Sequence, residues 1–399
     1  MAQVFPFRPY RYTAQAGAPL DHLVTQPYDK IYQPMRERYL SLSPYNLVRV
    51  ILGKPYEQAA AHFHDWIAAA VLARDPEPAF YAYFQQFSDP DTGDLLTRKG
   101  FIGLGQVEPY EAQIVHRHEQ TLSGPKKDRL EVLRHTHAHF GQIFMLYPDR
   151  QGEIDALLDQ AASQPATAET TDEYAANHKL WKITDPAVVA RIQSLMADKK
   201  LVIADGHHRY ETALNFAAES QLLDARRVMM TFVNMHSPGL RILATHRLVK
   251  DLPDFNPAPL LQHTTPLSID AFKQRAASYD PAKILIGIAL PGDARVHALE
   301  TPRNPGDLDV NFLHQRLLGE TLGITEAAIR EEKHLQYVRG IDAALAELQN
   351  GPAQVAFLLQ PTRIEEVADV SFSMGVMPQK STDFYPKLLS GLTIYRLEQ

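Results

Sequence analysis

The chain has 399 residues, of which 45% are hydrophobic, and this is enough for two or three domains with substantial cores. Its formal charge of -7 argues against a general nucleic-acid-binding surface, because neutralising phosphates requires a basic excess. The absence of cysteine excludes disulfides, thiolate zinc sites and a cysteine nucleophile. Since the chain contains no apolar run of membrane-spanning length and no signal-peptide core at its start, we expect a cytoplasmic protein without a membrane partner.

The first chemically notable segment is QPYDKI, residues 26–31. Pro27 restricts the backbone ahead of Tyr28 and Asp29, so the carboxylate of Asp29 is held in a turn. The same pattern is also compatible with a plain structural turn. Further along, we predict an amphipathic helix over 56–72 and a strand over 79–87.

Residues 113–149 form a second stretch that is rich in ionisable groups. A strand with His116 and His118 on one face is followed by a polar segment, a helix and another strand; the polar segment contains Glu119, Thr121, Lys126, Lys127, Asp128 and Arg129. Such a segment is typical of an active-site lid, although a solvated charged loop fits it equally well. His135 and His139 have the spacing of a metal-binding pair on a helix, but no third ligand is marked out, so we do not favour metal binding there.

A predicted helix over 185–198 has Asp185 as its N-cap and Pro186 at its first position. The next stretch is LVIADGHHRYETALNFAA, residues 201–218, which predicts a buried strand, a turn and a helix. We expect Asp205 to cap this helix, and Gly206 to permit the tight turn.

The turn at 205–209 predicts an anion site. A strand-to-helix turn presents free backbone N–H groups and the positive end of the helix dipole, which together bind phosphate. Arg209 adds a planar fork of donors, and His207 and His208 add imidazoles that bind or move protons near neutral pH. Any one of these three residues alone would more often be an ordinary polar residue. Their combination behind a strand and an Asp-Gly turn favours the anion site.

The rest of the chain predicts an α/β (α+β) protein with mixed sheets and two lobes. We expect a hairpin about residues 237–239, with His246 and Arg247 at the end of its second strand. A Pro-rich linker at 251–259 separates a lobe over 1–250 from a second α/β lobe over 251–399. We expect the segment 377–391 to return to the cleft of the first lobe, because its polar residues suit phosphate and magnesium-bound oxygens; these residues are Lys380, Ser381, Thr382 and Lys387.

Six segments together resemble, along nearly the whole chain, the bacterial and archaeal family called domain of unknown function 1015. These segments are QPYDKI, HEQTLSGPKKDRLEVLR, ADGHHRYETAL, FVNM with ATHRLV, LDVNFLH, and MPQKSTDFYPKLLSGL. The Asp-Gly-His-His-Arg element also resembles the ParB and sulfiredoxin superfamily, in which Gly-x-x-Arg at a helix start holds nucleotide phosphates. Gly206 and Arg209 match those shared positions. The resemblance therefore implies a ParB/sulfiredoxin-like nucleotide-binding core.

The branches of that superfamily differ in activity. ParB proteins bind and hydrolyse CTP on chromosomes, sulfiredoxins use ATP to repair an oxidised cysteine, and another branch phosphorylates free serine. This chain has no cysteine, so the sulfiredoxin activity is excluded. A ParB-type DNA clamp needs a helix-turn-helix and a basic surface, neither of which we find in the sequence.

The leading hypothesis from the sequence is a nucleotide-dependent phosphotransferase that acts on a small hydroxylated metabolite, with free serine as the first guess. The expected cofactors are ATP or another nucleotide and Mg²⁺. We assign to the phosphates the residues Asp205, Gly206, His207, His208, Arg209, Lys126, Arg129, Lys380, Ser381 and Thr382. Glu119 is the expected base, Asp29 is the second candidate, and His118 orients whichever acts.

Two alternatives stay open. One is a regulatory ParB-like module that binds CTP or ATP without phosphoryl transfer. The other is a metal-dependent phosphatase or other hydrolase that uses the histidines. The expected partners are a nucleotide and a small-molecule substrate rather than nucleic acid, and the sequence leaves the oligomeric state open.

Overall fold

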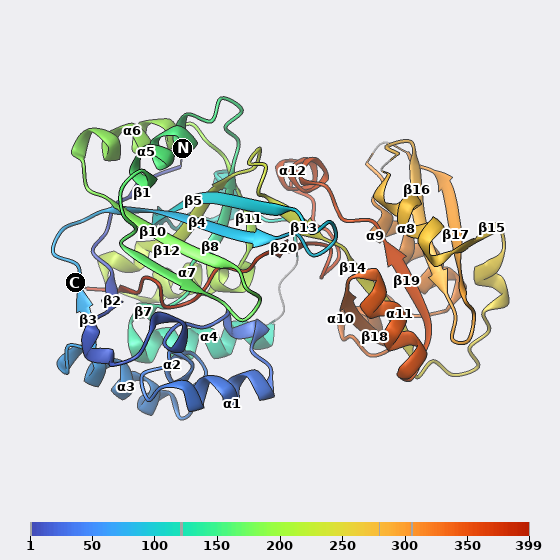
Figure 1. Ribbon diagram of the computed structural model, residues 1–399, viewed down its shortest axis with the longest axis horizontal. Coiled ribbons are helices and arrows are strands. Elements are labelled where there is room, and N and C mark those ends of the chain that lie inside the picture. The colour runs from blue at the N-terminus through green and yellow to red at the C-terminus, as the bar shows by residue number, and fades with distance from the viewer. Residues whose placement is uncertain (1, 120–122, 279, 305, 399) are drawn as a thin grey trace. The chain divides into compact units, whose positions relative to one another are not determined.

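The computed structural model describes residues 2–119, 123–278, 280–304 and 306–398 (Figure 1). The chain divides into two compact units. The first contains Met1–Arg241 and Pro386–Gln399, and the second contains Ile242–Tyr385, so the second unit is inserted into the chain of the first. The first boundary lies a few residues before the linker predicted from the sequence.

A nine-stranded mixed sheet forms the centre of the first unit. Its order is β6 (Val115–His116), β11 (Leu201–Asp205), β8 (Ile143–Tyr147), β12 (Arg227–Asn234), β5 (Leu95–Gln106), β4 (Phe80–Ser88), β10 (Asn177–Ile183) and β9 (Ala168–Thr171), with β1 (Val4–Phe5) paired to β5. The pairs β6/β11 and β8/β12 are parallel, and the other described pairs are antiparallel. The central strands β8 and β12 are almost fully buried, which explains their continuous apolar sequences.

Helices cover both faces of this sheet. In Figure 1, α5 (Glu153–Ala162) and α6 (Pro186–Met196) lie above it, while α1 (Gln33–Leu42), α2 (Val48–Ile51), α3 (Tyr56–Ala68) and α4 (Ser123–Thr136) lie below it. The helix α7 (His207–Glu219) packs against α4 and contacts β8 and β12. As predicted, α6 starts at Pro186, and the Asp185 side chain accepts a hydrogen bond from the backbone of Ala187.

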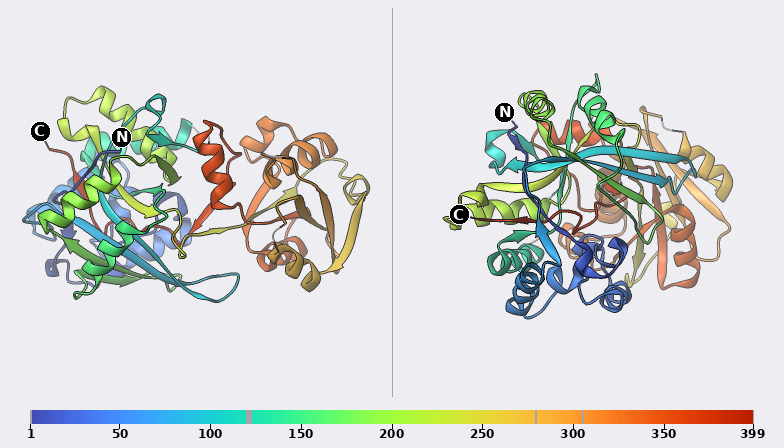
Figure 2. Two further views of the ribbon diagram at one scale, coloured as in Figure 1. Left: turned by 90° about the horizontal axis from the view of Figure 1, so that it is seen from above. Right: turned by 60° about the vertical axis from the view of Figure 1, so that its left-hand side comes forward.

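Short elements complete the first unit. Two small sheets pair β2 (Tyr10–Tyr12) with β3 (Leu72–Arg74) and β7 (Ala138–His139) with β21 (Tyr395–Arg396). The described residues also form the 3₁₀-helices η1 (Ala14–Ala16), η2 (Leu20–His22), η3 (Tyr28–Lys30), η4 (Tyr110–Ala112), η5 (Leu223–Arg226) and, in the second unit, η6 (Ala258–Leu261). The dark red C-terminal segment lies among blue and green elements of the first unit in Figure 2, and Ser390 and Ile394 form bridges with Thr25 and Tyr10.

The second unit is built on a six-stranded antiparallel sheet. Its order is β15 (Thr264–Ser268), β17 (Arg295–Pro302), β16 (Lys283–Ala289), β19 (Ala353–Leu359), β14 (Thr245–Lys250) and β18 (Leu335–Arg339). One core contains side chains of α8 (Ile269–Ala277) and α11 (Ile341–Asn350), and another contains side chains of α9 (Asp309–Phe312), the π-helix η7 (Leu313–Thr321) and α10 (Glu326–Arg330). The unit also contains α12 (Ile364–Phe372) and a small sheet of β13 (Arg241–Leu243) and β20 (Asp383–Tyr385).

The structure confirms the predicted mixed α/β fold but not the predicted hairpin. The strand β12 ends at Asn234 in the large sheet, whereas β14 is an interior strand of the second unit. The strand between them, β13, pairs with β20 instead. His246 and Arg247 therefore belong to the second unit, and the hairpin prediction is wrong. Within the described residues, we find no helix with the length and apolarity of a membrane span.

Candidate functional site

The turn predicted to bind an anion joins β11 to α7. Gly206 has φ +98°, a left-handed conformation in which a side chain would be strained. A Cβ at this position would also lie 3.0 Å from the guanidinium of Arg209. The prediction that Asp205 is the N-cap is wrong, because the cap is Gly206 and, in the described part of the chain, no side chain caps α7. The first backbone N–H groups of α7 therefore receive no side-chain cap from the described residues.

The carboxylate of Asp205 lies among several cations instead of capping the helix. Its Oδ2 is 2.7 Å from Nη2 of Arg209, and its Oδ1 is 3.4 Å from Nζ of Lys387. Burial raises the pKa of Asp205, but Lys387, Arg209 and Lys30 lower it more, so the net pKa is well below the usual value. Lys387, Arg209 and Lys30 thus gather around the carboxylate of Asp205, and a cluster of cations suits a bound anion.

Two histidines lie side by side next to this turn. The ring centroids of His118 and His207 are 4.7 Å apart, with an angle of 75° between the rings. His118 donates through Nδ1 to the carbonyl oxygen of Ile203 at 2.8 Å, because a carbonyl can only accept, and so Nε2 is an acceptor in the neutral ring. His207 is 6% exposed, and its buried Nε2 has no hydrogen-bond partner among the described residues. An orphaned imidazole nitrogen beside a helix start is the kind of group that a ligand would satisfy.

Burial makes both histidines neutral at pH 7. It lowers the pKa of His118 to about 4, and burial together with His118 lowers the pKa of His207 well below its ordinary value. Neither imidazole therefore adds a permanent charge to the site. Both act through hydrogen bonds, and His118 offers an acceptor that can orient a hydroxyl or a carboxyl group.

We expect acid to destabilise the protein through these histidines. Between the ordinary pKa of 6.5 and the folded value of about 4, the unfolded chain binds a proton at His118 that the folded chain does not. The free energy of unfolding therefore falls as the pH decreases through this range, by up to about 3 kcal/mol for His118. Urea unfolding at pH 7, 6 and 5 measures the slope. The substitution His118→Gln keeps a donor for Ile203 and should flatten the slope, whereas His64→Gln, at an exposed position, should not; equal slopes in both variants would contradict this assignment.

The C-terminal segment delivers Lys387 to the site and is held there by buried polar contacts. Arg98, which is 1% exposed, donates to the carbonyl oxygen of Pro386. Gln85 donates to the carbonyl oxygen of Lys387 at 2.8 Å, and Ser390 exchanges two backbone hydrogen bonds with Thr25. These contacts fix the segment before any ligand binds, which is the preorganisation that binding sites need.

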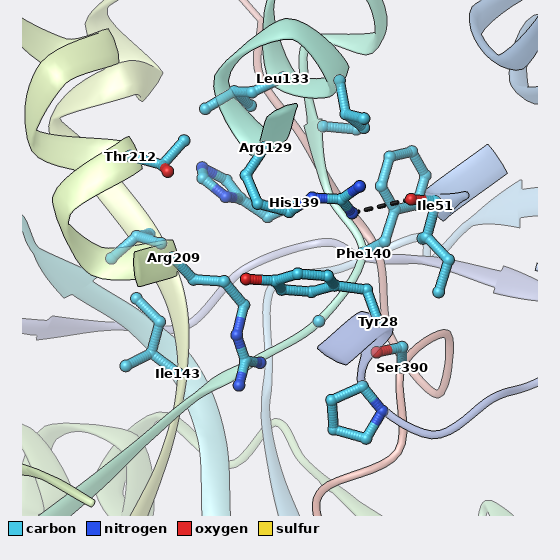
Figure 3. Close-up of a pocket in the computed structure, with 15 residues that line it drawn as sticks. Tyr28, Ile51, Arg129, Leu133, His139, Phe140, Ile143, Arg209, Thr212 and Ser390 are labelled. Carbon is cyan, nitrogen blue, oxygen red and sulfur yellow. Dashed lines mark hydrogen bonds between the residues drawn. The ribbon is translucent and has the colours of Figure 1, made fainter. Parts of the chain in front are cut away.

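A pocket of about 70 Å³ opens beside Arg209 (Figure 3). Tyr28 lies between the labelled side chains of Arg129 and Arg209, and the guanidinium of Arg129 is 4.2 Å from the centre of the Tyr28 ring. Burial and Asp29 raise the pKa of Tyr28 to about 12, so its hydroxyl stays protonated. The pocket therefore combines an aromatic ring, a hydroxyl group and two guanidinium groups next to the turn.

The candidate bases and the other predicted phosphate ligands of the first unit lie on several different elements. Glu119 is half-buried and directly follows His118, while Asp29 is exposed in η3, beside Tyr28. The ammonium of Lys126 is 2.9 Å from Glu211, one turn into α7, and His208 is half-buried in the first turn of that helix. Thr121 lies outside the described residues.

The remaining predicted phosphate ligands belong to the second unit. The carbonyl oxygen of Lys380 accepts a hydrogen bond from Arg247 at 3.0 Å, and that of Ser381 accepts one from Thr362 at 2.8 Å. Thr382 lies next to them in the chain. Their role in phosphate binding stays a prediction, whereas Lys387 from the same predicted segment contacts Asp205.

The histidine pair considered for metal binding does not lie on one helix. The helix α4 ends at Thr136, so His135 is helical, while His139 lies in β7 and stacks on Tyr395. Across the residues that the structure describes, no group of three His, Cys, Asp or Glu side chains is arranged to hold a metal ion. The expectation of Mg²⁺ stays a prediction, since this ion is often held by one or two carboxylates together with phosphates of the substrate.

Sequence reasoning did not single out three residues of the site: Lys30, Gln142 and Ser390. Lys30 contributes to the charge around Asp205, and the backbone carbonyl of Gln142 accepts a hydrogen bond from Arg209. Ser390 lines the pocket. Lys30 lies within the segment QPYDKI, and Ser390 lies within MPQKSTDFYPKLLSGL. Both segments stood out in the sequence, and membership of these segments is the signal that could have identified the two residues.

Comparisons with known proteins place the chain in a family. No protein of curated function matches it. Among solved structures, it is similar to a conserved hypothetical protein from Pyrococcus furiosus, with a TM-score of 0.36 and 12% identity over 69% of this chain and 90% of that one. It is also similar to a free serine kinase in complex with AMP, with a TM-score of 0.39 and 11% identity over 71% of this chain and 88% of that one. A third similar structure is a C-terminally truncated SbnI from Staphylococcus aureus, with a TM-score of 0.35 and 11% identity over 73% of this chain and 87% of that one. The model of the protein family of unknown function DUF1015 matches residues 4–317, and the chain therefore belongs to the DUF1015 family.

Proposed function

We propose that this protein is a nucleotide-dependent phosphotransferase that transfers a phosphoryl group to a small hydroxylated metabolite, with free serine as the first acceptor to test. The observation that carries this proposal is the convergence of groups at the start of α7. Arg209 and Lys387 surround one carboxylate there, and the buried Nε2 of His207 has no partner among the described residues. These groups and the helix start form an anion site of the kind that nucleotide phosphates occupy.

The phosphates of the nucleotide would lie against the turn itself. Gly206 lets the backbone approach a ligand closely, and the dipole of α7 favours negative charge at its first residues. Nε2 of His207 would donate one hydrogen bond, and Arg209 would exchange part of its contact with Asp205 for phosphate oxygens. His208, Lys126 and Arg129 are further candidate donors around the same helix start.

The transfer step needs a hydroxyl nucleophile, a base and charge stabilisation. The acceptor oxygen forms a bond to the terminal phosphorus, while the bond from that phosphorus to its bridging oxygen breaks and the shortened nucleotide leaves with that oxygen. Glu119 would take the proton of the hydroxyl, with Asp29 as the second candidate. Because Nε2 of His118 only accepts, it would orient the substrate through one of the substrate's donor groups rather than the ionised base itself. Arg209 and Lys387 would stabilise the charge on the transferred group. Mg²⁺, when bound, would neutralise phosphate oxygens, with Asp205 or Asp29 as carboxylate ligands.

A regulatory module that binds CTP or ATP would use the same turn. The pocket beside Tyr28 is compatible with either function, so substitution of the proposed base is what distinguishes them. Full activity in the presence of a chelator would count against the metal-dependent phosphatase alternative.

We expect nucleotides to stabilise the folded protein. A ligand present at 100 times its dissociation constant raises the free energy of unfolding by about 2.7 kcal/mol, because it binds only the native state. Thermal unfolding with ATP, ADP and CTP, each with and without Mg²⁺, measures this effect. Adenosine, which lacks phosphates, is the control and should give a much smaller shift. A shift of equal size with adenosine, or no shift with any nucleotide, would contradict the proposed phosphate site.

A further inference from the structure

We infer that the pocket beside Tyr28 selects an acceptor that is a small carboxylate with a short aliphatic side chain. This inference rests on the proposed function, because it names the chemistry of the acceptor. It concerns a space that is separate from the phosphate-binding turn but shares Arg209 with it. The pocket lies within the first unit, and its lining combines apolar side chains with hydrogen-bond donors.

Most of the pocket's lining is apolar, with the imidazole of His139 and the hydroxyl of Thr212 among its polar exceptions. Its walls are buried side chains from several elements around α4, β8 and β12: Ile51, Val132, Leu133, Phe140, Ile143 and Val228. Protein cores are close-packed and retain few spaces larger than a water molecule. A space of about 70 Å³ holds roughly five non-hydrogen atoms, by comparison with the 10–15 Å³ that one water needs. A polar group placed against these walls would lose its water without gaining partners, so the walls suit an aliphatic group.

The mouth of the pocket offers hydrogen-bond donors for an anion. Arg209 donates through Nη1 to Gln142 and through Nη2 to Asp205, and Arg129 donates to Asp128 and Ile51. In the described structure these bonds use two of the five N–H groups of Arg209 and three of those of Arg129. The remaining groups belong to planar forks, which match the geometry of a carboxylate.

Gly141 marks the place where these donors meet. A Cβ at Gly141 would lie 3.0 Å from Oγ of Ser390 and 3.3 Å from Nη1 of Arg209. A side chain here would press against both groups, so glycine lets the hydroxyl and the guanidinium lie close to the backbone at this point. Since the backbone of Gly141 is not in the left-handed region, alanine is compatible with its conformation, and the reason for glycine here is space rather than backbone freedom. The geometry assigns the carboxylate to this point and the aliphatic chain to the interior.

Small carboxylates that lack a hydroxyl test this assignment without turnover. Butyrate and isobutyrate should raise the midpoint of thermal unfolding of the full-length protein, while acetate, which has no chain for the interior, should raise it much less. Gly141→Ala displaces Ser390 and Arg209, which supply the donors for the carboxylate, and Val132→Ile removes space among the apolar walls. Both substitutions should weaken butyrate binding at least tenfold. Val115→Ile adds the same methylene group at a buried position that does not line the pocket, and it should bind butyrate like the original protein.

Each outcome decides one question. Equal butyrate affinity in Val132→Ile, Gly141→Ala and Val115→Ile, or no shift with butyrate, overturns this inference while nucleotide stabilisation is retained. Loss of nucleotide stabilisation with butyrate binding intact overturns the proposed function instead. Inorganic phosphate is the probe for the proposed phosphate site at the turn: if Val132→Ile weakens phosphate and butyrate binding equally, the substitution does not act through the pocket, and the inference is overturned.

Discussion

Replacing Arg209 with alanine is expected to weaken nucleotide binding by roughly 10- to 100-fold, because each hydrogen bond to a charged group contributes about 1.5–3 kcal/mol. Arg209 is the cation at the proposed site that lies closest to the helix start, and its guanidinium packs against Gly206. Its loss removes both a charge and a fork of donors. Isothermal titration of the nucleotide that gives the largest thermal shift measures the effect.

Two variants show whether this loss is specific. Arg209→Lys keeps the charge but loses the planar fork, so it should bind nucleotide with an intermediate affinity. Arg191→Ala removes an exposed arginine that pairs with Glu153 on the surface of the same unit, and it should bind like the original protein. If Arg209→Ala folds and binds nucleotide with unchanged affinity, the phosphates do not lie at this turn.

The local part of this site could be predicted from the sequence because it depends on neighbours in the chain. All residues of the run Leu201–Ala204 are apolar, as a strand buried on both faces requires. Gly206 stands at the turn between this strand and α7, where the backbone is left-handed. Asp185 was recognised as an N-cap by the same reasoning. The identical residue type at Asp205 does not act as a cap, because it is the last residue of the strand and its carboxylate binds Arg209 and Lys387.

Contacts between distant segments could not be predicted in the same way. The charge around Asp205 depends on Lys30, near the start of the chain, and on Lys387, near its end. A periodic pattern describes one element at a time and contains no information on which elements meet. The same limit explains the wrong hairpin: β12 and β14 follow each other closely in sequence, yet β14 completes the sheet of the inserted unit.

The arrangement of the site explains how one carboxylate and several cations coexist before a ligand binds. Asp205 pairs with Arg209 and Lys387, and in the proposed function phosphate oxygens would take over part of these contacts. The neutral state of His118 and His207 limits the positive charge that the fold must bury. Nucleotide binding at this site is a proposal, and binding alone would not establish transfer. The residue that distinguishes transfer from binding is the proposed base.

Substituting Glu119 with glutamine is expected to lower phosphoryl transfer roughly 100- to 10,000-fold, the usual contribution of a positioned general base, while nucleotide affinity stays the same. Glutamine keeps the size of the side chain but cannot accept the proton of the hydroxyl. Transfer to free serine and to short aliphatic hydroxy acids can be followed by the release of the shortened nucleotide, and affinity by the thermal shift. Glu111→Gln, at an exposed position in η4, is the matched control and should leave both unchanged.

The pattern of losses in this experiment separates the candidate functions. A transferase with Glu119 as its base loses turnover and keeps its nucleotide, whereas a regulatory module has no turnover to lose and keeps its nucleotide in every variant. Unchanged transfer in Glu119→Gln would contradict the assignment of the base, and Asp29→Asn then tests the second carboxylate, which is exposed beside Tyr28 at the pocket. A turnover defect in Asp29→Asn alone would move the reacting hydroxyl to the Tyr28 side of the site, where Arg129 and Arg209 face the same pocket.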